Sequence, residues 1–262
     1  MIKALRTAST GMAAQQMNVD NIANNLANVN TTGFKKAKLE FQDVMYQSLR
    51  QSGVTSGGDS TVPTSLDVGY GTRPIATTRQ FAVGEFQQTG NPLDLAIDGD
   101  GFFQVTMPDG TVGYTRDGSF KLNGEGRIAT SDGYFLSPEI SIPEDATAIS
   151  IGFDGTVSVL QAGSNDPVEL GQIELARFIN PAGLSAIGHN LYQETPASGS
   201  ALVGVATESG LGQVQQGYLE LSNVDVVNEM VNMIVAQRAY EINSKVIQTA
   251  DDMSSLVNSL KR

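Results

Sequence analysis

Glycine and proline, which disfavour helix interiors, are almost absent from both ends of this chain. Residues 1–28 contain no proline and one glycine, Gly11, and residues 218–262 contain neither. All nine prolines lie within residues 63–196, and 27 of the 28 glycines lie within residues 33–217. This distribution predicts two long terminal helices around a turn-rich centre. Such a chain is more typical of a polymer subunit than of an enzyme, because its helices have no core of their own.

Apolar residues in the N-terminal segment alternate at spacings of three and four, as a coiled-coil seam requires. Ala8 and Gln15 are weaker members of this pattern. The helix should end near Asn30, where Thr31-Thr32-Gly33 favours termination. The N-terminal seam is formed by Leu5, Met12, Val19, Ile22 and Leu26.

The C-terminal segment repeats this spacing. Ser222 followed by Asp225 has the spacing of a capping box and predicts the start of the helix. We expect the two helices to pack together as an antiparallel pair, and we expect them to be ordered only on assembly, since isolated helices are marginal. The C-terminal seam is formed by Val235, Ile242, Val246, Met253, Leu256 and Leu260.

The N-terminal helix is also rich in asparagine, which is a mediocre helix former. One interpretation is a frayed and solvated helix end. The alternative, which we favour, is an amide network satisfied by neighbouring subunits, because a solvated face would normally carry Glu, Lys and Arg. The asparagines are Asn18, Asn21, Asn24, Asn25, Asn28 and Asn30.

The centre of the chain has the turn signals of a β-rich domain. Short apolar stretches alternate with Asp-Gly or Asn-Gly dipeptides, which favour tight turns and hairpins. The chain is therefore predicted to have an α+β fold, with a coiled-coil-like helical domain and a central, mainly β domain. The dipeptides begin at Asp109, Asp117, Asn123, Asp132 and Asp154.

Three parts are predicted along the chain. Residues 1–30 and 222–262 form the helical domain, the core of a polymer, and residues 76–204 form the central β domain. Residues 31–75 and 205–221 form an extended linker region. Within it, residues 47–66 are rich in serine and threonine and have the composition of a flexible linker or extended loop.

Composition and charge exclude several classes of function. The net charge of −12 argues against a nucleic-acid-binding surface, and the one basic cluster, Lys35, Lys36 and Lys38, is expected to be a solvated face. The chain contains no cysteine, so disulfides and thiolate chemistry are excluded. It shows neither a membrane-spanning apolar run nor the apolar core of a cleavable secretory signal.

No catalytic, cofactor-binding or metal-binding residues are predicted. The single histidine, His189, has no partner of ligand type nearby in the sequence and is expected to be structural or exposed. Asp98 and Asp100 do not begin a calcium loop, because Phe103 stands where that loop requires glycine. A tight turn before a strand explains residues 98–101 better.

Four long motifs resemble the flagellar axial family, the rod and hook proteins of the bacterial flagellum. They are VDNIANNLANVNTTGFKKAKLEFQDVMYQ at 19–47, LDLAIDGDGFFQV at 93–105, GYTRDGSFKLNGEGRIATSDGYFL at 113–136 and SNVDVVNEMVNMIVAQRAYEINSKVIQTADDM at 222–253. The resemblance covers nearly the whole chain. The residues that carry the two terminal motifs are Asn21, Asn24, Asn25, Asn28, Gly33, Phe34, Gln237, Arg238, Tyr240 and Glu241.

The resemblance implies a non-enzymatic structural subunit of a rigid helical polymer that crosses the periplasm and transmits motor torque to the hook. Length and residues 47–66 favour the distal rod; the alternatives are a proximal rod paralogue of similar length and a ligand-binding β domain with oligomerising helices. Implied partners are further copies of the chain, proximal rod proteins, the hook or its junction, the L- and P-ring bushing and the flagellar type III export apparatus. Nucleic acid, cofactors and membrane embedding are not expected.

Overall fold

The computed structural model describes residues 2–50, 64–163 and 166–260, which fall into two compact units. The helical unit lies within residues 1–27, 37–78 and 225–262, and the β unit within residues 28–36 and 79–224. The predicted α+β fold is confirmed. Strands of the predicted linker region are shared between the units: those of residues 37–78 group with the helices, and those of residues 205–221 group with the β unit.

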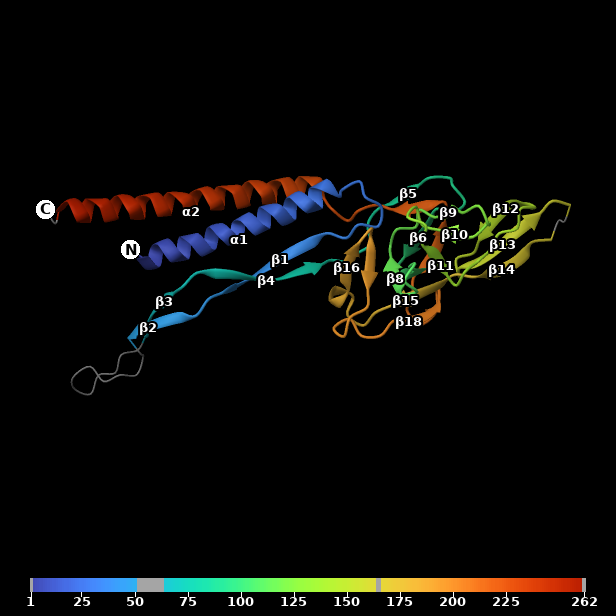
Figure 1. Ribbon diagram of the computed structural model, residues 1–262, viewed down its shortest axis with the longest axis horizontal. Coiled ribbons are helices and arrows are strands. Elements are labelled where there is room, and N and C mark those ends of the chain that lie inside the picture. Colours follow the sequence, from blue (N-terminus) through green and yellow to red (C-terminus); the bar gives the residue numbers. More distant parts are fainter. Residues whose placement is uncertain (1, 51–63, 164–165, 261–262) are drawn as a thin grey trace. The chain divides into compact units, whose positions relative to one another are not determined.

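The helical unit contains α1 (Ile2–Ala27) and α2 (Val226–Leu260), which run antiparallel and side by side (Figure 1). The prediction that Ser222 marks the start of this helix is wrong, because α2 begins at Val226. The carboxylate of Asp225 caps α2, because its Oδ1 accepts the N–H groups of Val227 at 2.9 Å and Asn228 at 3.2 Å. An aspartate here satisfies two free helix donors and also complements the positive end of the helix dipole.

Small side chains bring α1 and α2 close together. A Cβ atom added to Gly11 would lie 2.9 Å from the Nδ2 atom of Asn243 on α2. Because the helices are antiparallel, Ile2, nine residues before Gly11, lies level with about residue 252, nine residues after Asn243. The last eight residues of α2, about 12 Å of helix at 1.5 Å per residue, therefore extend beyond α1, as Figure 1 shows.

A two-stranded ribbon completes the helical unit. Strand β1 (Ala37–Asp43) pairs with β4 (Thr72–Arg79), and β2 (Tyr46–Arg50) pairs antiparallel with β3 (Leu66–Gly69). Strands β2 and β3 include both ends of the predicted 47–66 segment. Residues 51–63 of that segment lie outside the described residues.

The amide of Asn25 joins α1 to the ribbon. Its Nδ2 donates to the carbonyl oxygen of Ala37 at 2.9 Å, and its Oδ1 accepts the N–H of Ala37 at 3.0 Å. Asn21 Nδ2 donates to the same carbonyl at 2.8 Å. These two asparagines are thus satisfied within the chain, and not by neighbouring subunits as the sequence suggested, because β1 folds back beside the end of α1.

The β unit is built from antiparallel pairs. Strand β5 (Phe86–Gln88) pairs with β20 (Tyr218–Glu220), β6 (Leu95–Asp98) with β19 (Gln213–Gln216), and β12 (Ala146–Ile151) with β13 (Thr156–Gln161), which pairs with β14 (Val168–Gln172). The largest sheet runs β16 (Ser185–Gly188), β17 (Leu191–Gln193), β8 (Val112–Thr115), β7 (Phe102–Thr106), β11 (Phe135–Ser137), β10 (Ile128–Ala129) and β9 (Lys121–Leu122). Strand β15 (Glu174–Arg177) pairs with β7 and β18 (Leu202–Val205), and a 3₁₀ turn spans Pro181–Gly183.

Four of the five predicted turns join paired strands. They are the dipeptides at Asp109, Asn123, Asp132 and Asp154. The fifth, Asp117-Gly118, does not form a hairpin; it passes β6, where the carbonyl of Gly118 accepts the N–H of Leu95 at 3.0 Å. Residues 98–101, predicted as a tight turn, form a bend between β6 and β7, where Gly99 and Gly101 have positive φ angles of 118° and 147°.

Two apolar clusters fill the β unit. The smaller cluster is aromatic, with Phe102 packed edge-on against Phe81 at 5.3 Å and Phe178 at 5.8 Å between ring centroids. Such arrangements satisfy the ring quadrupoles. The largest fully buried apolar side chains of the other cluster are Phe103, Phe120, Leu95, Ile97, Ile128, Leu136, Ile173 and Leu175.

The segment that leaves α1 is threaded into the β unit. Gly33 has a φ of 66°, and a Cβ atom there would lie 2.6 Å from the backbone of Arg116 and Asp117, so only glycine fits. The N–H of Gly33 donates to the carbonyl of Glu220 at 2.8 Å, and Thr32 Oγ1 donates to Asp117 Oδ1 at 2.9 Å. Residues 28–36 are therefore a fixed part of the β unit.

Three buried charges hold this segment in place. Glu220 accepts hydrogen bonds from the Lys35 ammonium through Oε1 and from the Arg116 guanidinium, at 3.4 Å, through Oε2. Glu220 Oε1 also accepts the N–H of Gly84 at 2.9 Å, and Lys35 Nζ donates to the carbonyl of Ala82 at 2.8 Å. The ion cluster of Lys35, Arg116 and Glu220 thus joins four separate stretches of the β unit.

Lys35 corrects a prediction, because it belongs to the basic cluster that was expected to be solvated. Its side chain is 0% exposed, whereas Lys38 is exposed. Burial lowers the pKa of the Lys35 ammonium, and the Glu220 carboxylate partly offsets this effect. Glu220 and the Ala82 carbonyl replace water around the ammonium, so their hydrogen bonds offset part of the free-energy cost of desolvating Lys35.

We predict that Glu220→Gln lowers the free energy of unfolding of the β unit by about 3–5 kcal/mol, because it leaves two buried cations without their carboxylate. Lys35→Met should cost less, since Glu220 then retains Arg116. Urea denaturation of the full chain, followed by circular dichroism and tyrosine fluorescence, measures both.

The matched control is Glu125→Gln, which removes the same charge from an exposed pair with Arg127. It should leave the denaturation midpoint unchanged. Equal midpoints for the Glu220 and Glu125 variants would show that the buried cluster does not stabilise the β unit.

Candidate assembly surface

Helix α2 exposes a long apolar stripe. Val227 at its start is 71% exposed and Ile242 in its middle is 63% exposed. Contiguous exposed apolar side chains of this extent mark an interaction site on a soluble protein. The α2 stripe is formed by Val227, Met230, Val231, Ile234, Val235, Ile242, Val246, Met253, Leu256 and Val257.

The α2 stripe contains the predicted C-terminal seam, but this is not the face that meets α1. The face against α1 repeats every seven residues at Glu229, Ala236, Asn243 and Ala250, and Ala236 is only 1% exposed. Ala236 follows Val235 directly, so the two faces lie about 100° apart around the helix. The side chain of Leu260, the last predicted seam residue, lies outside the described residues.

The predicted N-terminal seam is divided between the interior and the surface. Ile22 is buried, whereas Leu5, Met12, Val19 and Leu26 are half-buried. Ala8, a weaker member of the predicted seam, and Ala14, which was not predicted to belong to it, are both buried on α1. The recurrence of small residues could have indicated this contact face, because closely packed helices need small side chains where they touch.

Three residues of the C-terminal family motif line a groove between the two helices. Gln237, Tyr240 and Glu241 face Gln16 and Val19 across a space of about 510 Å³. A second hollow of about 390 Å³ continues from Tyr240 along α2 to Gln248. Arg238 of the same motif is exposed. This part of the motif is therefore available to a neighbouring chain.

The N-terminal family motif has a different placement. Asn21 and Asn25 hold the ribbon, as described above, and Gly33 and Phe34 are buried. Asn28 Oδ1 accepts the hydroxyl of Thr31 at 3.2 Å, and Asn24 is exposed. Most of this motif therefore maintains the fold, whereas the C-terminal motif faces outward.

The ribbon is anchored to the start of α1. Gln47 Oε1 accepts hydrogen bonds from Lys3 Nζ at 2.5 Å and from the Tyr70 hydroxyl at 2.8 Å, while the Arg6 guanidinium lies 5.7 Å from the centre of the Tyr70 ring. The ribbon also exposes large apolar side chains. They are Phe41, Met45, Tyr46, Leu49, Leu66 and Ile75.

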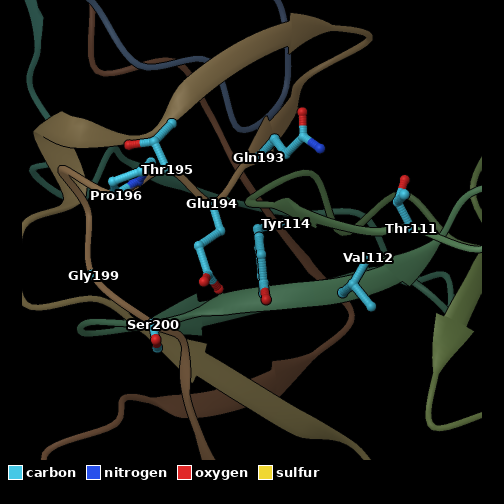
Figure 2. A pocket seen from close by; sticks show the side chains of 9 residues that line it. All are labelled: Thr111, Val112, Tyr114, Gln193, Glu194, Thr195, Pro196, Gly199 and Ser200. Atoms are coloured by element: carbon cyan, nitrogen blue, oxygen red, sulfur yellow. The ribbon is translucent and has the colours of Figure 1, made fainter.

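One hollow of the β unit offers little support for catalysis. It encloses about 590 Å³, and Figure 2 shows Tyr114 and Glu194 side by side among its lining residues. Burial raises the pKa of the Tyr114 phenol, and the Glu194 carboxylate adds to the rise. Glu194 is the only carboxylate among the described lining residues. His189 lies elsewhere, exposed in the turn after β16, 3.3 Å from the carboxylate of Asp132.

Within residues 2–50, 64–163 and 166–260, no group of three or more histidine, aspartate or glutamate side chains is arranged to hold a metal ion. Neither helix, over its described residues, has an apolar stretch long enough to span a bilayer.

Family models match the chain in three places. The model "Flagella basal body rod protein" matches residues 5–35, and "Flagellar basal body rod FlgEFG protein C-terminal" matches residues 215–260. The model "Flagellar hook protein FlgE/F/G D1 domain" matches residues 96–159. The first two coincide with the terminal helices and the third with strands of the β unit.

Several curated proteins match over their full length. The chain is 53% identical to the flagellar basal-body rod protein FlgG of Borreliella burgdorferi, with all of both chains covered. It is 48% identical to the proteins of the same name from Buchnera aphidicola subsp. Schizaphis graminum and from Caulobacter vibrioides, with 99% of this chain and all of theirs covered. The chain therefore belongs to the FlgG family of flagellar basal-body rod proteins, and it is a structural subunit of the flagellar distal rod.

Proposed function

We propose that this subunit polymerises through its helical unit, and that the resulting rigid helical homopolymer transmits motor torque to the hook. The observation that carries the proposal is the α2 stripe, whose large apolar side chains are exposed in the single chain. Transfer of each such side chain out of water contributes about 1.5–3 kcal/mol. In the proposed polymer, terminal helices of neighbouring subunits would bury the α2 stripe.

The two faces of α2 allow folding and assembly at the same time. The face with Ala236 and Ala250 is used against α1 within the chain, and the α2 stripe remains free for neighbours. The groove at Gln237, Tyr240 and Glu241 offers a second, chemically different surface. Two unlike surfaces on one chain favour a heterologous contact that repeats without closing, which generates a helical polymer.

The resemblance supports the remaining partners and the location. We propose that the rod crosses the periplasm between proximal rod proteins and the hook or its junction, inside the L- and P-ring bushing. The flagellar type III apparatus would export the chain without a cleavable signal peptide. In this function the chain is a non-enzymatic mechanical element, neither embedded in a membrane nor bound to nucleic acid or a cofactor.

The seam assignment is tested by Ile242→Asp. Ile242 is exposed in the single chain, so the substitution should leave both units folded, but in the polymer it would bury an unpaired carboxylate. We expect polymerisation to weaken by more than about a hundredfold, the equivalent of a few kcal/mol. Sedimentation and electron microscopy of rods measure this change.

Ile187→Asp is the matched control. It makes the same substitution at an exposed isoleucine of β16, in the β unit and outside the helical unit through which the chain is proposed to polymerise. It should polymerise as the unmodified chain does. Leu26→Asp should also block assembly, but Leu26 is half-buried within the chain, so its effect includes a loss of fold. Normal rods containing Ile242→Asp would refute the assignment.

The terminal helices should be weakly protected in the free subunit and strongly protected in the polymer. Their contact face buries mainly alanines, together with the polar groups of Asn25 and Glu229, so it offsets little of the entropy lost on ordering. Hydrogen exchange measured on dilute chain and on rods provides the comparison. Strong protection of residues 5–26 and 235–256 in the dilute chain would contradict this expectation.

Residues 47–66 are proposed to stiffen the rod. Bending a helical polymer requires rows of subunits to slide, and an extended arm that bridges adjacent subunits would resist this sliding. The ribbon supports the idea because it carries the ends of this segment on strands β2 and β3. Deletion of residues 47–66 should permit polymerisation but give curved or compliant rods. Straight rods of unchanged stiffness, measured by electron microscopy, would show that the segment is only a loop.

A further inference from the structure

A small cavity in the β unit lies beside the buried ion cluster. It encloses about 140 Å³ and is lined by Phe81, Phe102 and Phe178 together with Arg116, Arg177 and Asp100. This volume is below the roughly 300–1,000 Å³ of sites for drug-sized ligands. It suits a group of a few heavy atoms, given that a water molecule occupies about 30 Å³ of liquid. The cavity is distinct from the α2 stripe, which belongs to the helical unit.

Arg116 lines this cavity, and its guanidinium is almost fully buried. Its side chain is 2% exposed, and its two terminal nitrogens donate to Glu220, to the carbonyl of Ile97 at 3.3 Å and to the carbonyl of Gly99 at 2.7 Å. Its Nε–H is buried and has no hydrogen-bond partner among the described residues. Buried donors are almost always paired, because an unpaired one carries its full desolvation penalty.

The charges around the cavity are predominantly positive. Arg79 lies above the ring of Tyr192 at 5.7 Å and donates to the carbonyl of Lys35 at 3.4 Å, and Arg177 donates to the carbonyl of Ser209 at 3.2 Å. Among the described residues, neither arginine has a carboxylate within salt-bridge distance. The lining residues of the cavity carry two cations, Arg116 and Arg177, and one carboxylate, Asp100.

This local excess of cations contrasts with a chain of net charge −12. Glu220 is already shared between Lys35 and Arg116. Asp100 is exposed and is the one carboxylate among the cavity's lining residues. A further anion therefore meets more attraction than repulsion at this site. Arginine also offers planar donors that match the two oxygens of a carboxylate.

We propose that this cavity binds a carboxylate group, held by the Arg177 guanidinium beside the positive charge of Arg116, with its carbon chain against the phenylalanine rings. The size of the cavity limits the ligand to a small carboxylate or to the end of an aspartate or glutamate side chain. The carboxylate comes either from a free small anion or from an acidic side chain of a second copy of this chain. The chemistry of recognition is the same in both cases.

The binding step is tested on the dilute full-length chain with sodium acetate as the probe. The Arg116 Nε–H signal is followed in ¹⁵N NMR spectra, where burial should keep it sharp; an Arg116→Lys variant assigns it among the nine arginines. Acetate should shift this signal saturably, whereas sodium chloride at equal ionic strength should not. Arg177→Gln should weaken acetate binding about tenfold, since a charge-assisted hydrogen bond is lost.

The control is Arg127→Gln, which removes an exposed arginine whose partners are Glu125 and Glu139. Acetate should bind this variant with unchanged affinity. An Arg116 signal that acetate leaves unmoved, or that acetate moves equally in the Arg177→Gln variant, would overturn the proposal. The probe is measured on dilute chain, so this result does not depend on the proposed polymerisation.

A second measurement identifies the source of the carboxylate and rests on the proposed self-assembly. If a second copy supplies it, Arg177→Gln should weaken polymerisation about tenfold, and acetate should compete with polymerisation of the unmodified chain. If a free anion supplies it, Arg177→Gln should polymerise normally while still losing acetate affinity. Failure of polymerisation in the unmodified chain would count against the proposed function and leave the acetate result intact.

Discussion

The architecture of the β unit depends on one carboxylate. Glu220 lies on β20 and fixes Lys35, Arg116 and the backbone of Gly84, which come from regions far apart in the sequence. Through Lys35 it holds the segment that leaves α1, and the adjacent carbonyl of Glu220 accepts the N–H of Gly33. Buried ion pairs seldom stabilise a fold more than apolar packing would. Here the pairing selects a single path for the chain, since only one threading brings all three charges together.

In the helical unit, the residues that hold the fold differ from those that are exposed on its surface. Polar and small side chains make its internal contacts, with Asn25 holding Ala37 and Ala236 facing α1. Large apolar side chains are left on the outside, on α2 and on the ribbon. This distribution leaves large apolar side chains in water on the single chain. In the proposed polymer these surfaces would become buried between neighbouring subunits.

The general plan of the molecule could be predicted from the sequence, but most of the contacts could not. The absence of glycine and proline at both ends indicated the helices, and the Asp-Gly turns indicated the β unit, because both signals are local in sequence. Lys35 was expected in solvent, since its partner lies 185 residues away and no local pattern reveals the pair. The spacing of bulky apolar residues indicated the exposed stripe of α2. It did not indicate the alanine face, since small residues carry little hydrophobic signal.

The unequal lengths of the two helices have a directional consequence. The end of α2 extends about two turns beyond the start of α1, so the helix pair has one flush end and one single-helix end. Met253, Leu256 and Val257 lie on that single helix and are exposed. Two pairs stacked end to end can overlap only when the overhang of one lies beside a helix of the next. A joint of this kind has polarity, and a filament built from it has two distinguishable ends.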